Sequence, residues 1–453
     1  MDIQTRLKEA GKMKLSVIGM GKLGACSAAC FASKGFEVTG VDVNENFVDA
    51  INQGKAPLYE PRLQELITAA KGRLKATQDF EKAIKESDIT FLIVSTPSKP
   101  DGNFSDKYLL DALNHLCLAL KKADKKYHLF VVTSTVSPGT TDRNFIPLIE
   151  TVSGKALNKG FGVCYSPEFI ALGNVINDFL NPDFVLIGES NRFAGDQLAE
   201  IYRTVCENKP YIARMSIMSA EIAKISLNAY VTMKISFANT LANICEAIPG
   251  TDVDAITKAL GSDKRISPYF LKGGLSYGGP CFPRDNRAFT AFAKMYGVAA
   301  PLATATDEVN QLQIQRLVKR LLQLVPADDK RKKIAILGLS YKPNTPVIEE
   351  SAGVKIIEEL LDQQKGIEII VYDPLAMDNA RAYLGEKVSY ASSVEECFSR
   401  ASVCIIATQA EEFKLIDEGY IAHNPTMIID CWRQFDQSRF SSKVHYIALG
   451  RAE

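Results

Sequence analysis

Short apolar runs that end in polar turns alternate with helical patterns along the first part of the chain. An apolar strand at 14–18 leads into a glycine turn, a helix at 23–33 and a second strand at 37–41. Later apolar runs end in the turns "STP", "STVSPGTT" and "SPEF". Strands that alternate with helices predict a doubly wound parallel sheet, which binds ligands at the carboxyl ends of its strands.

The middle of the chain has the pattern of one long helix. The stretch "SIMSAEIAKISLNAYVTMKISFANTLANICEAI" contains no glycine or proline and is apolar on most faces. Such a helix is buried, either within a domain or against another subunit. Glu221, Lys224 and Asn228 nevertheless share one stripe of it, at spacing i, i+3 and i+7. The presence of a lysine in an otherwise apolar, buried helix requires an explanation, and a functional role would provide one.

The last part of the chain repeats the alternation of strand and helix. After the solvated run "ADDKRKK" come the apolar strands "IAIL", "IEIIVY", "SVCII" and "TMIID". The first turn of this part, 338–342, lacks the triple-glycine spacing of the first sheet. The fold class predicted is α/β, with two Rossmann-like doubly wound parallel sheets joined by a long central helix and a helical domain. We place the domains at 1–212, 213–325 and 326–453.

Composition and charge exclude several classes of protein. The chain has 453 residues with 53 Lys+Arg and 53 Asp+Glu, so its net charge does not favour nucleic acid or an anionic membrane as partner. No apolar run approaches the ~20 residues of a membrane helix, and the first residues lack the apolar core of a signal peptide. The ten cysteines have no paired C-x-x-C spacing. We therefore expect a reduced, cytoplasmic protein without a metal site.

The first glycine turn carries a dinucleotide-binding pattern. Gly19, Gly21 and Gly24 follow a strand and open a helix, and Asp42 closes the next strand 18 residues after the third glycine. Such glycines allow a tight turn and let backbone N–H groups approach a pyrophosphate at the helix start. An acid at this position favours the ribose of NAD over the 2′-phosphate of NADP. A purely structural glycine turn is the alternative.

The polar turns after the later strands add residues on the cofactor side. Thr96, Thr135 and Glu168 follow three apolar runs, at the edge where a doubly wound sheet binds its ligand. For Thr96 the alternative is a local turn stabilised by its own hydroxyl.

One cysteine stands in an unusual loop, "YGGPCFPRD" at 277–285. Two glycines before Cys281 leave room for a substrate carbon to reach its sulfur, and the flanking prolines restrict the loop. Arg284 and Lys224 are candidate cations to favour a thiolate, and Asp285 can orient a lysine or a water. A catalytic cysteine and a packing cysteine beside a glycine turn both remain open from this spacing alone.

The loop resembles the G-x-G-G-x-C-x-x-K-D loop of the UDP-glucose and GDP-mannose 6-dehydrogenases, a family of nucleotide-sugar dehydrogenases. The resemblance extends in order through "VIGMGKLG", "GVDVNENF", "STPSKPDG", "STVSPGTT", "YSPEFIALG", "AEIAKISLNAY", "GLSYKPNT" and "EES". It implies an NAD-dependent, four-electron oxidation of a sugar C6 alcohol to the acid, without a metal. It also implies a cysteine thiohemiacetal, a thioester, and a role in supplying polysaccharide precursors.

The resemblance assigns roles by matching motif. Cys281 is similar to the nucleophile, Lys224 to the lysine that stabilises negative charge on the C6 oxygen, and Asn228 to the residue that helps hold sugar and lysine. The candidate catalytic residues are Cys281, Lys224, Asp285, Glu168, Thr135 and Asn228. The candidate cofactor-binding residues are Gly19, Gly21, Lys22, Leu23, Gly24, Asp42, Thr96, Pro97, Thr135, Glu168 and Arg284. The candidate substrate-binding residues are Glu168, Phe169, Lys224, Asn228, Arg265, Tyr269, Phe270, Leu271, Lys272, Tyr277, Gly278, Tyr341 and Lys342.

Two positions depart from the family pattern. Arg284 stands where the family has lysine, which keeps the charge and changes its geometry. Val347 and Glu349 stand at the aspartate and arginine positions of D-x-R-E-S. That arginine normally reaches the cofactor, so we expect Glu349 to weaken NAD binding.

The pattern around "YSPEF" favours UDP-glucose as substrate, with GDP-mannose and UDP-N-acetyl-hexosamines as alternatives. Two other functions remain open, a two-electron β-hydroxyacid dehydrogenase with Lys224 as acid and base, and a silent nucleotide-sugar-binding homologue. The apolar stretch at 218–248, together with the family resemblance, predicts a homodimer built on that helix, with a helix buried within one chain as the alternative.

Overall fold

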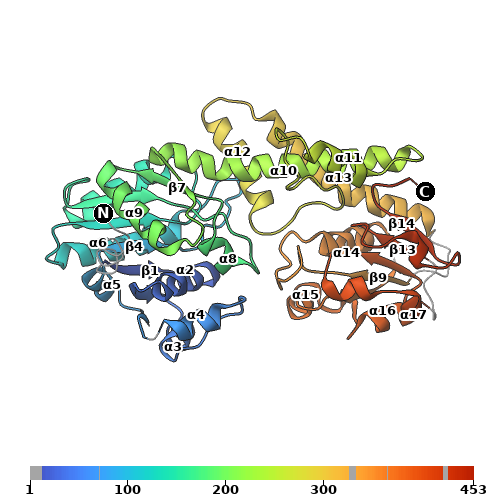
Figure 1. Cartoon of the computed structure of the whole chain (residues 1–453), viewed down its shortest axis with the longest axis horizontal. Helices are drawn as coiled ribbons and strands as arrows, with labels where there is room; N and C mark the ends of the chain where they lie inside the picture. Colours follow the sequence, from blue (N-terminus) through green and yellow to red (C-terminus); the bar gives the residue numbers. More distant parts are fainter. Residues whose placement is uncertain (1–12, 71, 326–332, 365, 422–426, 453) are drawn as a thin grey trace. The chain divides into compact units, whose positions relative to one another are not determined.

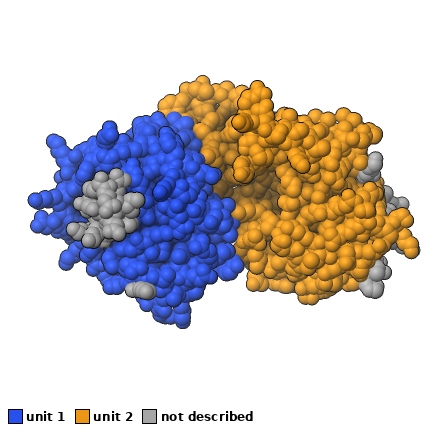
Figure 2. Space-filling model, in the orientation of Figure 1, with its two compact units in different colours: residues 1–225 blue, residues 226–453 orange. Residues whose placement is uncertain are grey.

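The computed structural model describes residues 13–70, 72–325, 333–364, 366–421 and 427–452. By its internal contacts the chain divides into two compact units, residues 1–225 and 226–453 (Figure 2). The three domains predicted from the sequence stay a prediction.

The first unit is built on an eight-stranded sheet of order β3-β2-β1-β4-β5-β6-β7-β8. The strands are β1 (Lys14–Ile18), β2 (Glu37–Val41), β3 (Leu74–Thr77), β4 (Ile89–Leu92), β5 (His128–Val132), β6 (Phe161–Tyr165), β7 (Phe184–Glu189) and β8 (Tyr211–Met215). All neighbours are parallel except β6 and β7. The doubly wound parallel sheet is confirmed, and its last two strands run the other way.

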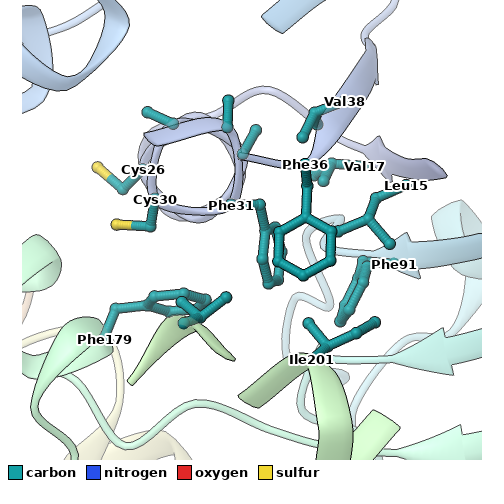
Figure 3. Close-up of a cluster of buried hydrophobic side chains, with 14 of the residues drawn as sticks. Leu15, Val17, Cys26, Cys30, Phe31, Phe36, Val38, Phe91, Phe179 and Ile201 are labelled. Carbon is teal, nitrogen blue, oxygen red and sulfur yellow. The ribbon is translucent and has the colours of Figure 1, made fainter. Parts of the chain in front are cut away.

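Helices connect the strands of this sheet (Figure 1), and apolar residues on one side of them are buried. They are α2 (Lys22–Ser33), α3 (Glu45–Asn52), α4 (Leu63–Ala69), α5 (Phe80–Glu86), α6 (Lys107–Lys122), α7 (Ile146–Ser153), α8 (Val175–Leu180) and α9 (Arg192–Val205), with a π-helical turn at Thr141–Phe145. In α2 every residue from 24 to 32 is buried. Figure 3 shows why: Phe31 reaches from α2 to Phe91, with ring centroids 4.7 Å apart, and to Phe179, at 5.4 Å.

The strand order fixes where this unit binds a ligand. From β1 the sheet continues through β2 to β3 on one side and through β4 to β8 on the other. In an open α/β sheet such a switch point leaves a crevice at the carboxyl ends of the strands. The glycine turn after β1 lies at this edge.

The long helix predicted from the sequence is α10 (Ile217–Ala247), which runs from the first unit into the second. It is followed by α11 (Val253–Gly261), α12 (Phe282–Met295) and α13 (Pro301–Leu324). Among the described residues, none of the helices combines the length and apolar character needed to cross a membrane.

The second unit carries a six-stranded, wholly parallel sheet of order β11-β10-β9-β12-β13-β14. Its strands are β9 (Lys333–Leu337), β10 (Glu368–Tyr372), β11 (Ser389–Tyr390), β12 (Val403–Ile406), β13 (Met427–Asp430) and β14 (His445–Ala448). Its helices are α14 (Ala352–Gln363), α15 (Met377–Leu384), α16 (Val394–Arg400) and α17 (Glu418–Ile421), with 3-10 turns at Gly385–Lys387, Glu411–Leu415 and Gln437–Arg439. The predicted second α/β unit is confirmed.

The turn after β9 repeats the glycine packing of the first sheet, and a carboxylate binds two of its N–H groups. Gly338 has φ +102°, and a Cβ on Gly353 would lie 2.1 Å from its carbonyl oxygen. Asp373, after β10, accepts the N–H groups of Leu339 and Ser340 at 2.8 and 2.9 Å. The backbone donors of this turn are thus bound by a carboxylate of the same chain.

Candidate active site

The glycine turn after β1 has the geometry of a phosphate-binding turn. Gly19 has φ +93°, and a Cβ there would lie 2.3 Å from the carbonyl oxygen of Ile93. A Cβ on Gly24 would lie 1.7 Å from the Gly19 carbonyl, so α2 must pack closely on the turn. Gly21 faces open space, with nothing within 4 Å of its Cβ position. Two glycines therefore serve packing and the third leaves room for a ligand.

The groups around this turn fit a dinucleotide. The helix α2 begins at Lys22, and no side chain caps its first N–H groups. These N–H groups can therefore donate hydrogen bonds to a diphosphate. Asp42 stands at the end of β2, where Met20 N–H and Asn44 N–H donate to it at 2.6 and 2.8 Å. Its carboxylate is thereby fixed at the position that contacts the ribose in Rossmann folds.

The loops after β4 and β5 are tied together at the same edge. Thr96 Oγ1 donates to the carbonyl of Thr135 at 2.7 Å. Ser134 Oγ accepts from Val94 N–H at 2.9 Å and donates to the Val94 carbonyl at 2.7 Å. The Thr96 hydroxyl therefore bonds to the neighbouring loop. It does not stabilise a local turn, which was the alternative considered from the sequence. Thr135 is partly buried, and Pro97 is exposed.

Glu168, after β6, meets a tyrosine and a lysine. The Tyr202 hydroxyl from α9 donates to Glu168 Oε1 at 3.3 Å. Lys224 Nζ donates to the Glu168 carbonyl and lies 4.4 Å from the centroid of the Phe169 ring. Burial raises the pKa of Glu168 to about 7, although the positive charge of Lys224 and the Tyr202 hydrogen bond act against that rise. A carboxyl with this pKa takes up and releases protons near neutrality.

The acid on the same stripe of α10 has a structural task. Glu221 is fully buried and accepts the N–H groups of Gly139 and Thr141, the latter at 3.0 Å. It thus holds the loop after β5, close to Thr135 in the sequence. Burial raises the pKa of its carboxyl.

In the second unit, Cys281 stands at the start of α12. Of the ten cysteines, all in the described part of the chain, it is the exposed one. Its carbonyl accepts from Asp285 N–H at 2.8 Å, in the first turn of the helix. A helix start carries partial positive charge, which favours a thiolate there.

Asp285 is buried beside this cysteine and both of its oxygens are bound. Asn228 Nδ2, from α10, donates to Oδ2 at 2.6 Å, and Arg284 Nε donates to Oδ1 at 3.1 Å. Three predicted site residues are thus brought together in the second unit. The arginine that replaces the family lysine is paired with the adjacent aspartate.

The two glycines before Cys281 are explained by packing. A Cβ on Gly278 would lie 2.2 Å from the carbonyl oxygen of Glu350, and one on Gly279 would lie 2.5 Å from the Tyr341 ring. Gly279 N–H also donates to the Glu349 carbonyl at 3.0 Å. The loop at 341–350 occupies the space that the sequence suggested was left open for a substrate.

The positions that depart from the family lie in this loop. The Val347 carbonyl accepts from Tyr341 N–H at 2.9 Å, and the Glu349 side chain is exposed. Glu350, next to it, pairs with Arg287 of α12 at 3.1 Å and with Lys355. Lys342 lies with its Nζ 5.8 Å from the centroid of the Tyr341 ring.

The predicted substrate-binding residues of "RISPYFLKGGLSYGG", at 265–279, are exposed in the first half of the segment and mostly buried in the second, apart from Lys272. Arg265 pairs with Asp263 at 2.7 Å and is exposed. Tyr277 is buried, and its hydroxyl donates to Asp307 at 3.0 Å. Burial raises the pKa of that hydroxyl. Exposed side chains in this segment include Tyr269, Phe270 and Lys272, whereas Leu271 is buried.

Buried amides hold the second half of this segment, and the sequence did not single them out. Asn310 accepts from the N–H of Tyr277 at 2.8 Å and donates to its carbonyl at 3.0 Å. Asn239 does the same for Gly274 N–H, at 2.8 Å, and the Leu275 carbonyl, at 3.1 Å. An asparagine at a helical position gives no sign in the sequence of the backbone that it will meet.

No group of three or more His, Cys, Asp or Glu side chains that could hold a metal ion occurs among the described residues.

Comparison with known proteins covers nearly the whole chain. Three models of the UDP-glucose/GDP-mannose dehydrogenase family match it: the NAD binding domain at residues 13–206, the central domain at 218–312 and the UDP binding domain at 335–437. A UDP-glucose 6-dehydrogenase of Haloferax volcanii is 38% identical over 92% of this chain and 96% of its own. A GDP-mannose 6-dehydrogenase of Pseudomonas aeruginosa is 34% identical over 93% of this chain and 100% of its own. A solved UDP-glucose dehydrogenase from Pyrobaculum islandicum superposes with a TM-score of 0.88 at 31% identity, covering 97% of this chain and 98% of that one.

Proposed function

Because this chain belongs to the UDP-glucose/GDP-mannose dehydrogenase family, we propose that it oxidises the C6 alcohol of UDP-glucose to the carboxylic acid in two NAD-dependent steps. The observation that carries the proposal is the placement of Cys281. It is the exposed cysteine at the start of α12, above a buried Asp285 whose oxygens are both bound.

The first unit holds the cofactor. The N–H groups at the start of α2 receive the diphosphate of NAD, and Asp42 binds its ribose. NAD bound there would supply the hydride acceptor for both oxidations, that of the alcohol and that of the thiohemiacetal, with one NAD used for each.

Cys281 retains the aldehyde between the two oxidations. Its thiolate adds to the aldehyde carbon, so a C–S bond forms and the carbonyl oxygen takes the negative charge. The family resemblance gives the Lys224 ammonium group the role of stabilising that charge, as an oxyanion donor does. Oxidation of this adduct leaves a thioester, and attack by water breaks the C–S bond and returns the thiolate.

Hydrolysis of the thioester needs a group that takes a proton from water. Glu168, with its pKa raised to about 7, is suited to that task near neutral pH. Thr135, tied to Thr96 through its carbonyl, helps to place the water. Asp285 and Asn228 form a buried pair that orients the groups around the sulfur.

The choice of UDP-glucose rests on the nucleotide end and on the relatives. The model that matches residues 335–437 describes a UDP binding domain. The relatives include a UDP-glucose 6-dehydrogenase, and GDP-mannose is the second candidate because the GDP-mannose enzymes match over a similar length.

The test counts NADH for each sugar oxidised, with UDP-glucose, UDP-N-acetyl-hexosamines and GDP-mannose as substrates. We expect two NADH for each UDP-glucose, and loss of complete turnover in Cys281→Ser. Cys245→Ala, which removes a buried thiol of the same unit, is the control. Normal turnover by Cys281→Ser would exclude the nucleophile. One NADH for each sugar would favour the two-electron alternative, and binding without turnover would favour the silent homologue.

We also propose that the chain forms a homodimer through α10. Tyr230, Phe237 and Ile244 are spaced by seven residues on this helix and are 57%, 52% and 49% exposed in the single chain. Seven-residue spacing places them on one face, and a second copy of that face would cover them. Sedimentation of Phe237→Glu tests this. We expect a monomer, and an unchanged dimer would exclude this face.

A further inference from the structure

A single lysine holds the exposed half of the predicted substrate arm, which we define as residues 265–279. Lys234 of α10 donates from Nζ to three carbonyl oxygens of the arm, those of Ile266 at 3.1 Å, Ser267 at 3.1 Å and Tyr269 at 2.6 Å. An ammonium group has three donors, and all three are used here.

The backbone that this lysine holds is strained. Ser267 has φ +66° and Phe270 has φ +61°. L-residues other than glycine, asparagine and aspartate rarely adopt this left-handed region, and they stay there only where their surroundings impose it. Phe270 is exposed and Ser267 is half-buried, so the arm has limited packing of its own to impose such a conformation. The bonds from Lys234 supply that constraint.

The strained turn places an aromatic ring against Phe282, the residue that follows the candidate nucleophile. The Phe270 ring lies edge-on to Phe282, with centroids 6.1 Å apart. Phe282 directly follows Cys281 and also contacts Tyr277, with centroids at 6.3 Å. A shift of the exposed turn would therefore move a ring that borders the catalytic loop.

We propose that Lys234 is a positioning residue, which holds the substrate arm in the one conformation that admits the nucleotide sugar. The identity of that ligand rests on the proposed function. Without the lysine, the arm samples other conformations, and the apparent affinity falls by the fraction of time that it spends in them. Chemistry at Cys281 proceeds at its usual rate once the substrate is bound, because Lys234 does not take part in it.

The experiment compares Lys234→Met, which keeps the length of the side chain and removes its donors, with Lys264→Met. Lys264 is an exposed lysine that directly precedes the arm. Hydrogen exchange of the ligand-free protein is followed by mass spectrometry in two peptides, 264–271 and 273–279. KM and kcat for UDP-glucose are measured in parallel, and sedimentation checks that the oligomeric state is unchanged.

For Lys234→Met we expect exchange at 264–271 to quicken about tenfold, with no change at 273–279, which Asn239 and Asn310 hold. We expect KM to rise about tenfold and kcat to stay within about twofold, the pattern of lost pre-organisation. Lys264→Met should leave all of these values unchanged.

Unchanged exchange at 264–271 would overturn the proposal, even if KM rose, because the lysine would then act on the ligand itself. A fall in kcat with KM unchanged would overturn it too. If exchange quickens throughout the second unit, Lys234→Gln replaces the methionine variant under the same criteria. Since exchange is measured without substrate, it decides the role of Lys234 even if the chain fails to oxidise any nucleotide sugar.

Discussion

Glu168→Gln should make the first unit more stable than the wild type as the pH rises above about 4.5, with the full gain reached at about pH 7. The folded state raises the pKa of Glu168 from 4.5 to about 7, so between these values it holds a proton that the unfolded chain has released. Stability falls with rising pH wherever the folded state binds more protons. The wild type therefore loses stability from pH 4.5 up to about pH 7 and loses no more above it.

The size of the effect follows from the same shift. One pKa unit corresponds to about 1.4 kcal/mol, so the shift amounts to about 3 kcal/mol of unfolding free energy. Glutamine resembles the protonated carboxyl and does not ionise. The variant should match the wild type near pH 4.5 and exceed it by about 3 kcal/mol at pH 8. When the variant and the wild type are compared at the same pH, the contributions of all other titrating groups to the unfolding free energy cancel.

The assay must report on the first unit alone. The single tryptophan, Trp432, lies in the second unit, so its fluorescence does not serve. Hydrogen exchange of peptides from β5 and β6, measured in increasing urea, reports on the stability of the first unit. Glu86→Gln, at an exposed site on α5, is the control for removal of a carboxyl. A difference that stays constant from pH 5 to 8 would refute the reasoning about burial. A wild type that gains stability over the variant would show that the Lys224 charge outweighs burial.

Three further predictions concern packing and a buried imidazole. Gly24→Ala should lower NAD affinity at least about tenfold by calorimetry, because its Cβ would collide with the Gly19 carbonyl. Gly279→Ala, with φ +84° and the Tyr341 ring 2.5 Å away, should destabilise the second unit by about 1 kcal/mol or more in urea melts followed by fluorescence. Burial lowers the pKa of His128 to about 3, so below its usual 6.5 the first unit should lose about 1.4 kcal/mol per pH unit, and a comparison with His128→Gln by hydrogen exchange measures that loss.

Local patterns predicted the parts of the fold that local patterns control. The strands at 14–18 and 37–41 were placed at their bounds, and the helix at 23–33 begins one residue earlier, at Lys22. Alternation and glycine spacing act over a few residues, so one sequence is enough to see them. The direction of β7 depends on which neighbour it pairs with, and nothing within 184–189 tells of that. The two-residue β11 was too short to carry a pattern.

The candidate site residues also fall into two groups, those that stand in a local motif and those that act through contacts with distant parts of the chain. Asp42 and Cys281 stand in motifs. In the structure Asp42 accepts Met20 N–H and Cys281 is exposed, and their roles stay predictions. Tyr202 and Lys234 act through contacts with residues far along the chain, and each looks in the sequence like an ordinary helical position. The sequence indicated that glycine is required before Cys281, but not why. Only the fold shows that another loop lies against these glycines.

Asp373 has a consequence for the number of cofactor molecules that one chain can take. Both sheets begin with the same close glycine contact, and in both a carboxylate accepts the N–H group that follows the first glycine. In the second sheet Asp373 also accepts the next N–H group, that of Ser340, so one donor fewer is left for a diphosphate. We therefore expect titration with NAD to saturate at one equivalent per chain. A duplicated scaffold can in this way hold two different nucleotides without competition between its halves.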